Sequence, residues 1–330
     1  MVLAPSPDRR SLLAGLAALL LPLTTWAQAR PQKQVLAFYY GWYGAPGHVT
    51  LDDAPEQPAG GPYDSLDPAT IERQVKQAKS AGLTGFIASW WGRGDRTDQQ
   101  LPHLLDTAKT AGLAIAAYVE TADTPDNLCR DIVYIFQTYV SHPAWLRLDG
   151  KPVIFLYDRV LQGIGLDGWQ KARALIEAAA PGALAFIATG NGPRQIAERT
   201  PFFDGLHIYD MPFYLAQPHT FAWLWRSGFY KSWVKAQKGL RVTTATVMPG
   251  YNDSKIPDRP PPRPIIDRNN GRTFRDLFGA VIAAKPDWIL IVSFNEWHEG
   301  SEIEPSAQSG DRELKTCAAM SARFLGQGPN

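Results

Sequence analysis

The sequence predicts a single-domain α/β fold, a (β/α)8 TIM barrel, from three observations. Eight short runs rich in β-branched and aromatic residues recur along the chain, and each is followed by a stretch with apolar residues at helical spacing. Eight such units within 330 residues match the usual size of this barrel. The sequence Gly-Trp-Tyr-Gly after the first run is not the glycine-rich phosphate loop of a doubly wound sheet, which is the competing fold.

The predicted strands and helices alternate in order along the chain. The helix predicted over 68–81 begins with Asp67-Pro68, an acidic N-cap followed by a first-turn proline. Gly82 and Gly112 each stand between an alanine and a strand, where helices commonly end. The predicted strands span residues 34–40, 84–90, 113–119, 152–157, 183–189, 204–209, 241–248 and 288–294.

The first 29 residues have the form of an export signal. Arg9 and Arg10 precede an apolar run over residues 12–23, and residues 27–29 (Ala-Gln-Ala) form a small-x-small cleavage site. The paired arginines resemble a twin-arginine signal. The apolar run is shorter than the about 20 residues of a membrane span, which favours cleavage over an uncleaved anchor. We therefore expect residues 30–330 to form the barrel of a periplasmic or secreted protein without membrane attachment.

Composition narrows the choice of function. A formal net charge of +1 argues against nucleic-acid binding, which needs a basic face. Two cysteines, Cys129 and Cys317, are too few for a disulfide scaffold or a zinc cluster, and sequence alone leaves open whether they pair. No spacing typical of metal ligands occurs among the His and Asp residues, so we expect no metal or cofactor.

Aromatic and acidic residues stand at the end of nearly every predicted strand. Because the βα loops of a barrel converge on one rim, these side chains are expected to gather there. One such aromatic residue alone is more often part of the core, but the repetition favours a ligand site. Rings cover the apolar faces of sugars while acids and amides bind hydroxyls, which indicates a neutral oligo- or polysaccharide ligand. The strand-end residues are Tyr39, Tyr40, Trp90, Trp91, Tyr118, Glu120, Tyr157, Asp158, Asn191, Tyr209, Asp210, Tyr251, Asp253, Asn295, Glu296, Trp297, His298 and Glu299.

Glu296 and Glu299 directly follow the apolar strand 288–294. A carboxylate buried without a partner is costly, so such acids usually have a partner or a chemical task. Glycoside hydrolysis uses two carboxyl groups that flank the scissile bond. If the chain turns helically here, the two side chains lie roughly 5–6 Å apart, as retaining enzymes require, whereas an extended chain separates them by roughly 10 Å. An ion-paired feature of the rim, with Arg or Lys nearby, is the alternative.

This turn and several strand regions resemble glycoside hydrolase family 99, which contains endo-α-mannosidases and endo-α-mannanases. The signature is Ser-Phe-Asn-Glu-Trp-His-Glu-Gly over residues 293–300, followed by Ile-Glu-Pro over 303–305. The resemblance runs in order from residue 35 to residue 305. Its other segments, similar to the first, second, third and seventh strand regions of the family, are 38–43, 85–92, 118–120 and 249–253 with 268–271.

The resemblance implies a (β/α)8 barrel and a retaining, endo-acting hydrolysis of α-mannosidic bonds without a metal. Carried over by motif, Glu299 is the general acid/base that protonates the leaving oxygen. Glu296 deprotonates the sugar's own 2-hydroxyl, which gives a 1,2-anhydro sugar. The resemblance further implies active-site contacts from Tyr251 and Asn295 and a sugar-binding side formed by Glu120. One member of each pair, Tyr39 or Tyr40 and Trp90 or Trp91, also lines that side, and His298 is expected as a hydrogen-bonding support.

The chain departs from the family pattern in places that concern the glycan. Thr121 follows Glu120 where the family often has proline, and Asn252 and Ser254 replace more acidic or Thr-rich versions of the seventh loop. These departures leave the reaction type standing but leave the glycan open. The competing function is a non-catalytic or differently specific carbohydrate-binding barrel in exopolysaccharide processing.

Three arginines in predicted loops are either surface residues or contacts for the substrate. The proline-rich loop 258–263 contains Arg259 and is expected as a stiff surface connection rather than a substrate clamp. Arg93 and Arg96 follow the second strand. They either bind an acidic sugar or are solvated, and charged side chains in loops are more often solvated.

Overall fold

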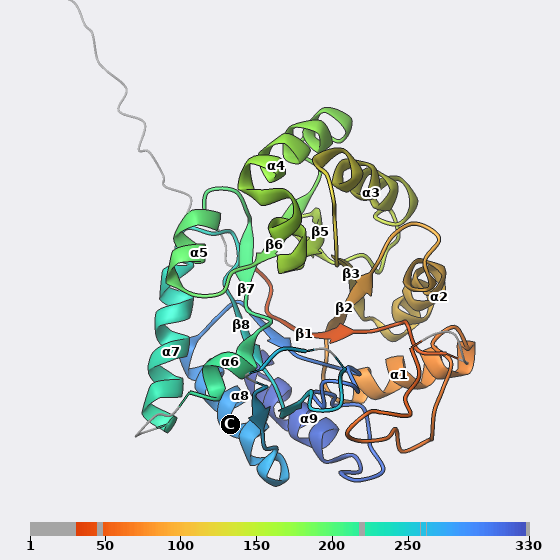
Figure 1. Ribbon diagram of the computed structural model, residues 1–330, viewed down its shortest axis with the longest axis vertical. Coiled ribbons are helices and arrows are strands. Elements are labelled where there is room, and N and C mark those ends of the chain that lie inside the picture. Colours follow the sequence, from red (N-terminus) through yellow and green to blue (C-terminus); the bar gives the residue numbers. More distant parts are fainter. Residues whose placement is uncertain (1–30, 45–48, 218–221, 258, 262, 328–330) are drawn as a thin grey trace, which may run out of the picture. The chain divides into compact units, whose positions relative to one another are not determined.

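Eight parallel strands form a nearly closed barrel in the computed structural model, which describes residues 31–44, 49–217, 222–257, 259–261 and 263–327 (Figure 1). The predicted (β/α)8 class is confirmed, and Pro31–Asn330 forms one compact unit. The predicted export signal over 1–29 lies outside the described residues. The strands are β1 (Gln34–Tyr39), β2 (Gly85–Trp90), β3 (Ala114–Val119), β5 (Lys151–Leu156), β6 (Ala185–Thr189), β7 (Gly205–His207), β8 (Thr244–Val247) and β11 (Trp288–Ile291).

Hydrogen-bonded ladders run in the order β7-β6-β5-β3-β2-β1-β11-β8, and every pair on this path is parallel. The path nearly closes on itself between β7 and β8, where Thr244 Oγ1 donates a hydrogen bond of 2.6 Å to the carbonyl oxygen of Leu206. Two short antiparallel pairings were not expected from the sequence. They are β4 (Arg147–Leu148) with β5, and β9 (Tyr251–Asn252) with β10 (Ile265–Ile266).

Helices surround the strands, as Figure 1 shows. The predicted start of α1 is confirmed, because the Asp67 carboxylate accepts hydrogen bonds from the backbone N–H groups of Ala69 and Thr70. Gly112 ends α2 in the left-handed conformation at φ 69°, which costs glycine little. The helices are α1 (Pro68–Ser80), α2 (Arg96–Ala111), α3 (Pro125–Thr138), α4 (Asp158–Ala179), α5 (Pro193–Arg199), α6 (Met211–Leu215), α7 (Ala222–Ala236), α8 (Arg272–Ala284) and α9 (Arg312–Leu325), with a 3-10 turn η1 (Asn269–Gly271).

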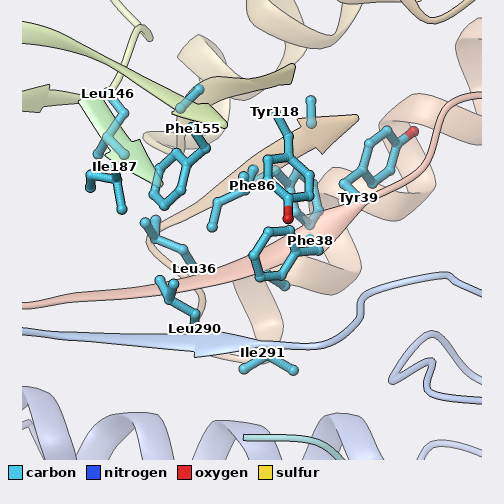
Figure 2. Packing of buried hydrophobic residues seen from close by; sticks show 14 of the residues in the cluster. Leu36, Phe38, Tyr39, Phe86, Tyr118, Leu146, Phe155, Ile187, Leu290 and Ile291 are labelled. Atoms are coloured by element: carbon cyan, nitrogen blue, oxygen red, sulfur yellow. The ribbon is translucent and has the colours of Figure 1, made fainter. Parts of the chain in front are cut away.

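The barrel interior is a packed core that supports the rim above it. The rings of Phe38 and Tyr118 lie 4.9 Å apart at their centroids, over a layer that includes Leu36, Phe155 and Leu290 (Figure 2). These branched and aromatic side chains fill the barrel in the manner expected of this fold.

The state of the cysteines and the length of the apolar helices complete the description of the fold. Both cysteines are free thiols, with Cys129 in α3 and Cys317 in α9. Across the part of the chain that the structure describes, no helix is long and apolar enough to cross a bilayer.

Candidate active site

A cavity of ≈ 330 Å³ opens where the barrel strands end. Its walls come from the segments that follow β1, β2, β3, β5, β7, β8 and β11, so the predicted convergence on one rim is present. Its size lies within the usual range for small-molecule sites. The lining residues are Tyr40, Trp42, Val49, Asp53, Trp91, Tyr118, Glu120, Tyr157, Arg159, Tyr209, Lys255, Ile256, Pro257, Arg259, Glu296, His298 and Glu299.

The turn after β11 brings Glu296 and Glu299 to this one cavity. The strand ends at Ile291, earlier than predicted, and the chain then turns tightly. Within the turn, the backbone N–H of Gly300 donates to the carbonyl oxygen of Trp297 at 3.2 Å. Of the two alternatives weighed from the sequence, the turned conformation is therefore the one adopted, and the extended one is excluded.

Glu296 is buried and only partly satisfied. Its Oε2 accepts no hydrogen bond from any described residue, while Oε1 lies 3.8 Å from His298 Nδ1. Burial raises the pKa of Glu296 to about 7, the neighbouring His298 opposes this shift, and the charge of Glu299 adds to it. A buried acceptor without a donor is costly, and a buried acid with a perturbed pKa at a cavity is a candidate functional group.

Glu299 differs because both of its carboxylate oxygens have partners. Arg259 Nη2 donates to Oε1 at 2.7 Å, and the Tyr209 hydroxyl donates to Oε2 at 3.1 Å. The Tyr40 and Tyr209 hydroxyls lie 2.6 Å apart. Burial raises the pKa of both tyrosines well above the ordinary value, so they remain protonated.

Glu120 is a third acid on the cavity wall. Ser89 Oγ donates to its Oε1 at 2.6 Å, and burial raises the pKa of Glu120 to about 8. The Tyr118 hydroxyl, on the same strand, has no hydrogen-bond partner within the described part of the chain. Glu120 and Tyr118 thus add a carboxyl group and a phenol to the lining of the cavity.

An aromatic wall leads outward from the acids. The ring centroids of Tyr40 and Trp42 are 4.6 Å apart, and those of Trp42 and Trp91 are 6.1 Å apart. On the other side, the His298 ring stacks on Tyr43 at 5.8 Å. Burial lowers the pKa of His298, but the Glu296 carboxylate more than offsets this, and the net direction is upward.

In each of the two ambiguous strand-end pairs, the second residue lines the cavity. Tyr40 and Trp91 face it, whereas Tyr39 and Trp90 turn into the protein. The Tyr39 hydroxyl donates to Gln74 Oε1 at 2.7 Å, and Trp90 Nε1 donates to an Asp98 oxygen at 2.9 Å. The sequence left the choice within each pair open, and the structure places Tyr40 and Trp91 at the cavity, while Tyr39 and Trp90, at the ends of β1 and β2, do not line it.

The side chains of Asn295 and Trp297 stabilise the backbone around the site and do not form its surface. Asn295 Oδ1 accepts from the backbone N–H of Tyr40 at 2.8 Å, and its Nδ2 donates to the carbonyl oxygen of Tyr40 at 2.8 Å. Trp297 is fully buried, and its Nε1 donates to the Tyr63 hydroxyl at 3.0 Å. Neither residue is among those that line the cavity, and their polar atoms hold the turn against β1 and its following loop.

Tyr251 lies one step behind the cavity wall. Its hydroxyl donates to Asp253 Oδ2 at 3.2 Å and accepts a hydrogen bond from Arg259. Arg259 in turn contacts Glu299, so Tyr251 reaches the site through that arginine. Tyr118, Tyr157, Tyr209 and His298 line the cavity where the sequence predicted a rim.

The structure corrects the prediction that the proline-rich loop 258–263 is only a stiff surface connection. Arg259 is not part of a plain surface connection, since it pairs with Glu299 and with Asp253 at 3.0 Å; positions 258 and 262 of the loop lie outside the described residues. Arg96 is not solvated either: its Nε donates to the Tyr43 carbonyl oxygen and it pairs with Asp64. Because the partners of both arginines lie far away in sequence, no local pattern could have predicted these contacts.

Trp42, Arg159 and Lys255 also line the cavity and were not predicted to do so. Among the residues that the structure describes, no group of three or more His, Cys, Asp or Glu side chains is arranged to hold a metal ion. The lining of the cavity offers carboxyl groups, hydroxyls, aromatic rings and the cationic side chains of Arg159, Lys255 and Arg259.

Comparisons with known proteins agree with this geometry. The family model of glycosyl hydrolase family 99 matches residues 52–315. A glycoprotein endo-α-1,2-mannosidase-like protein of Mus musculus is 28% identical over 344 residues, covering 83% of this chain and 70% of that protein. A glycoprotein endo-α-1,2-mannosidase of Xenopus laevis is 26% identical over 353 residues, covering 86% and 72%. The structure of the GH99 endo-α-mannosidase from Bacteroides thetaiotaomicron superimposes with a TM-score of 0.72 at 26% identity, covering 89% of this chain and 98% of that one. The chain therefore belongs to glycosyl hydrolase family 99 and is an endo-α-mannosidase-like glycoside hydrolase.

Proposed function

We propose that the protein is a retaining, endo-acting hydrolase of α-mannosidic linkages in a glycan or polysaccharide. The observation that carries this proposal is the placement of Glu296 and Glu299 in one cavity with different partners. One acid has a free oxygen for a substrate hydroxyl, and the other is surrounded by donors. Two acids in unlike surroundings are the usual basis for dividing roles in glycoside hydrolysis.

In the proposed first step, Glu296 Oε2 accepts the proton of the substrate's 2-hydroxyl. In a manno-configured ring this hydroxyl is axial, so O2 attacks C1 from the face opposite the leaving oxygen and forms a 1,2-anhydro sugar. The C1–O bond to the leaving group breaks in the same step. A pKa near 7 makes Glu296 a stronger base than an ordinary carboxylate, which suits this role.

Glu299 is proposed to donate a proton to the departing oxygen. Arg259 and Tyr209 hold its two oxygens, so the glycosidic oxygen must replace one of them when the substrate enters. In the second step Glu299 accepts a proton from water, the water oxygen bonds to C1, and the C1–O2 bond of the anhydro ring opens. Glu296 returns its proton to O2, which leaves the enzyme as it began.

The remaining assignments follow from the cavity wall. Tyr40, Trp42 and Trp91 are proposed to cover the apolar faces of the sugar rings, with Glu120 as a hydrogen-bond acceptor for their hydroxyls. The names of the relatives support an α-1,2 linkage. We also propose that residues 1–29 direct export and that the mature enzyme is periplasmic or secreted.

The test is digestion of α-1,2-linked mannan by the purified protein, followed by product analysis. We expect internal cleavage, seen as a ladder of oligosaccharides, with the first-formed reducing end in the α-configuration by proton NMR. Single sugars released from chain ends would contradict the endo assignment, and a first-formed β-anomer would contradict retention.

A matched acid variant provides the control. Glu198→Gln changes an exposed glutamate that pairs with Arg194 far along the chain from the turn, and it should digest mannan like the wild type. Binding of mannan oligosaccharides by the wild type without any cleavage would identify a non-catalytic carbohydrate-binding barrel instead.

A further inference from the structure

Arg159 lies at the mouth of the cavity, in the first turn of α4. Its guanidinium carbon sits over the Trp91 ring at 5.1 Å from the centroid and over the Tyr157 ring at 5.3 Å. Trp91 is 37% exposed, so this arrangement faces the opening rather than the core. Cation–π contacts of this kind fix the position of an arginine without using its N–H groups in hydrogen bonds.

Arg159 forms no ion pair with a carboxylate in the described part of the chain, unlike other arginines close to the site, although its charge opposes the upward shift of the Glu120 pKa. Arg259 pairs with Glu299 and Asp253, and Arg96 pairs with Asp64. The donors of Arg159 are thus held in place but unused. A planar guanidinium with free donors binds carboxylate and phosphate groups in a bidentate manner, which neutral hydroxyls reproduce less well.

The position of Arg159 relative to the acids defines where such a group would sit. The aromatic wall Tyr40–Trp42–Trp91 runs from the acids to Arg159. Deep in the cavity, the charge of Arg259 is already matched by Glu299 and Asp253. At the mouth, Arg159 and Lys255 offer positive charge, and Lys255 Nζ donates to the carbonyl oxygen of Ala54 at 3.3 Å, its one partner among the described residues.

We propose that Arg159 binds an anionic substituent, a carboxylate or a phosphate, on the sugar that stacks against Trp91. The inference rests on the proposed function and names its substrate class as an acidic glycan, in place of the neutral one that the sequence indicated. Attraction at the mouth would fix the register of the glycan relative to the acids.

The experiment compares three α-1,2-linked mannotrioses of equal length: the neutral form, one whose primary hydroxyls are oxidised to carboxylates, and one phosphorylated at a primary hydroxyl. Calorimetry on Glu296→Gln measures the dissociation constant (Kd) without turnover, and KM is measured on the wild type. We expect one anionic form to bind at least about tenfold tighter than the neutral form, with a preference that shrinks as salt is added. The form that is preferred identifies the substituent as carboxylate or phosphate.

Arg159→Gln, in the same background, should remove the preference, so that the anionic and neutral mannotrioses bind to this variant with dissociation constants within about twofold of each other. Arg159→Lys should restore part of it, because the charge returns without the planar fork. The matched control is Arg93→Gln, since Arg93 stacks on Tyr134 at 5.0 Å and is not among the residues that line the cavity. This control should keep the full preference.

Equal affinity for all three ligands, or a preference that survives Arg159→Gln, would overturn the inference. Hydrolysis without any preference would do so while leaving the proposed function intact. A preference that depends on Arg159, in a protein that cleaves none of the three, would support the inference and contradict the hydrolase assignment.

Discussion

Glu296 and Glu304 belong to the same segment after β11 and are almost equally buried, at 4% and 3% exposure, yet their surroundings are opposite. Glu304 accepts hydrogen bonds from Arg73 at 2.6 Å, Gln74 at 3.1 Å, Tyr63 at 2.8 Å and Trp297 at 3.2 Å. Glu296 leaves Oε2 without a donor among the described residues. Burial therefore does not separate these two acids; their position does, because Glu296 lines the cavity and Glu304 does not.

The largest effect should come from the two acids that face the cavity. Glu296→Gln and Glu299→Gln should each lower kcat by about 10³-fold, since each removes a proton-transfer group. The two variants should differ when the leaving group needs no protonation. With an α-mannobiosyl substrate carrying an acidic phenol, Glu299→Gln should recover most of its rate in the first step, and Glu296→Gln should not.

Measurement of the initial phenol release at several phenol pKa values tests this division. Equal recovery in both variants would reverse or remove the assigned roles. Glu304→Gln serves as the matched control, because it replaces a buried acid of the same segment with its amide. It should retain kcat to within about tenfold, provided the protein is assayed below its unfolding transition.

The second effect concerns the free energy of unfolding. Here Glu304→Gln should be more harmful than Glu296→Gln, the reverse of their order in kcat. Glu304→Gln places an amide N–H₂ against donors that need an acceptor and removes the charge facing Arg73, which should lower the free energy of unfolding by about 2–3 kcal/mol. Glu296→Gln should leave it unchanged or raise it, because a partly unsatisfied buried acid becomes neutral. Urea unfolding followed by circular dichroism measures both, and a larger loss for Glu296→Gln would break the comparison.

The third effect is the dependence of stability on pH. Burial raises the pKa of Glu296 from an ordinary 4.5 to about 7, so between these values the folded protein keeps a proton that the unfolded chain has released. The free energy of unfolding should therefore fall as pH rises from about 4.5 to about 7, by up to about 1.4 kcal/mol per pH unit from this group. Glu296→Gln should flatten that slope in urea titrations at half-unit pH steps; an unchanged slope would contradict the assigned pKa.

The sequence predicted the barrel well because its evidence is local. Strand and helix periodicity, the Asp67 cap and the turn at Gly112 depend on neighbours in the chain, and the structure contains all of them. The sequence did not decide which residues at the strand ends face the cavity. Whether Tyr39 or Tyr40 faces the cavity depends on where β1 ends, which Asn295 fixes through its two hydrogen bonds to the backbone of Tyr40.

The roles of charged residues were the hardest to predict, since their partners lie far away in sequence. Nothing near Glu304 indicates that Arg73 will reach it, and nothing near Arg259 indicates that it will reach Glu299. The motif therefore identified the acid pair, but it did not distinguish Asn295 and Trp297, which hold the turn, from residues that face the cavity.

The smallest effect concerns Glu120, whose number of hydrogen-bond donors is intermediate between those of Glu296 and Glu304. It has one donor, Ser89 Oγ, and otherwise faces the cavity. Ser89→Ala removes that bond, which opposes the upward shift of the Glu120 pKa, so the pKa should rise above its present value of about 8. We expect a loss of about 1 kcal/mol in stability and a loss in kcat/KM of no more than about fivefold. Carbon-13 NMR of labelled glutamate follows the titration. A loss in kcat as large as that of Glu296→Gln would instead place Glu120 among the groups that transfer protons, and burial with one partner would then be enough to make an acid catalytic here.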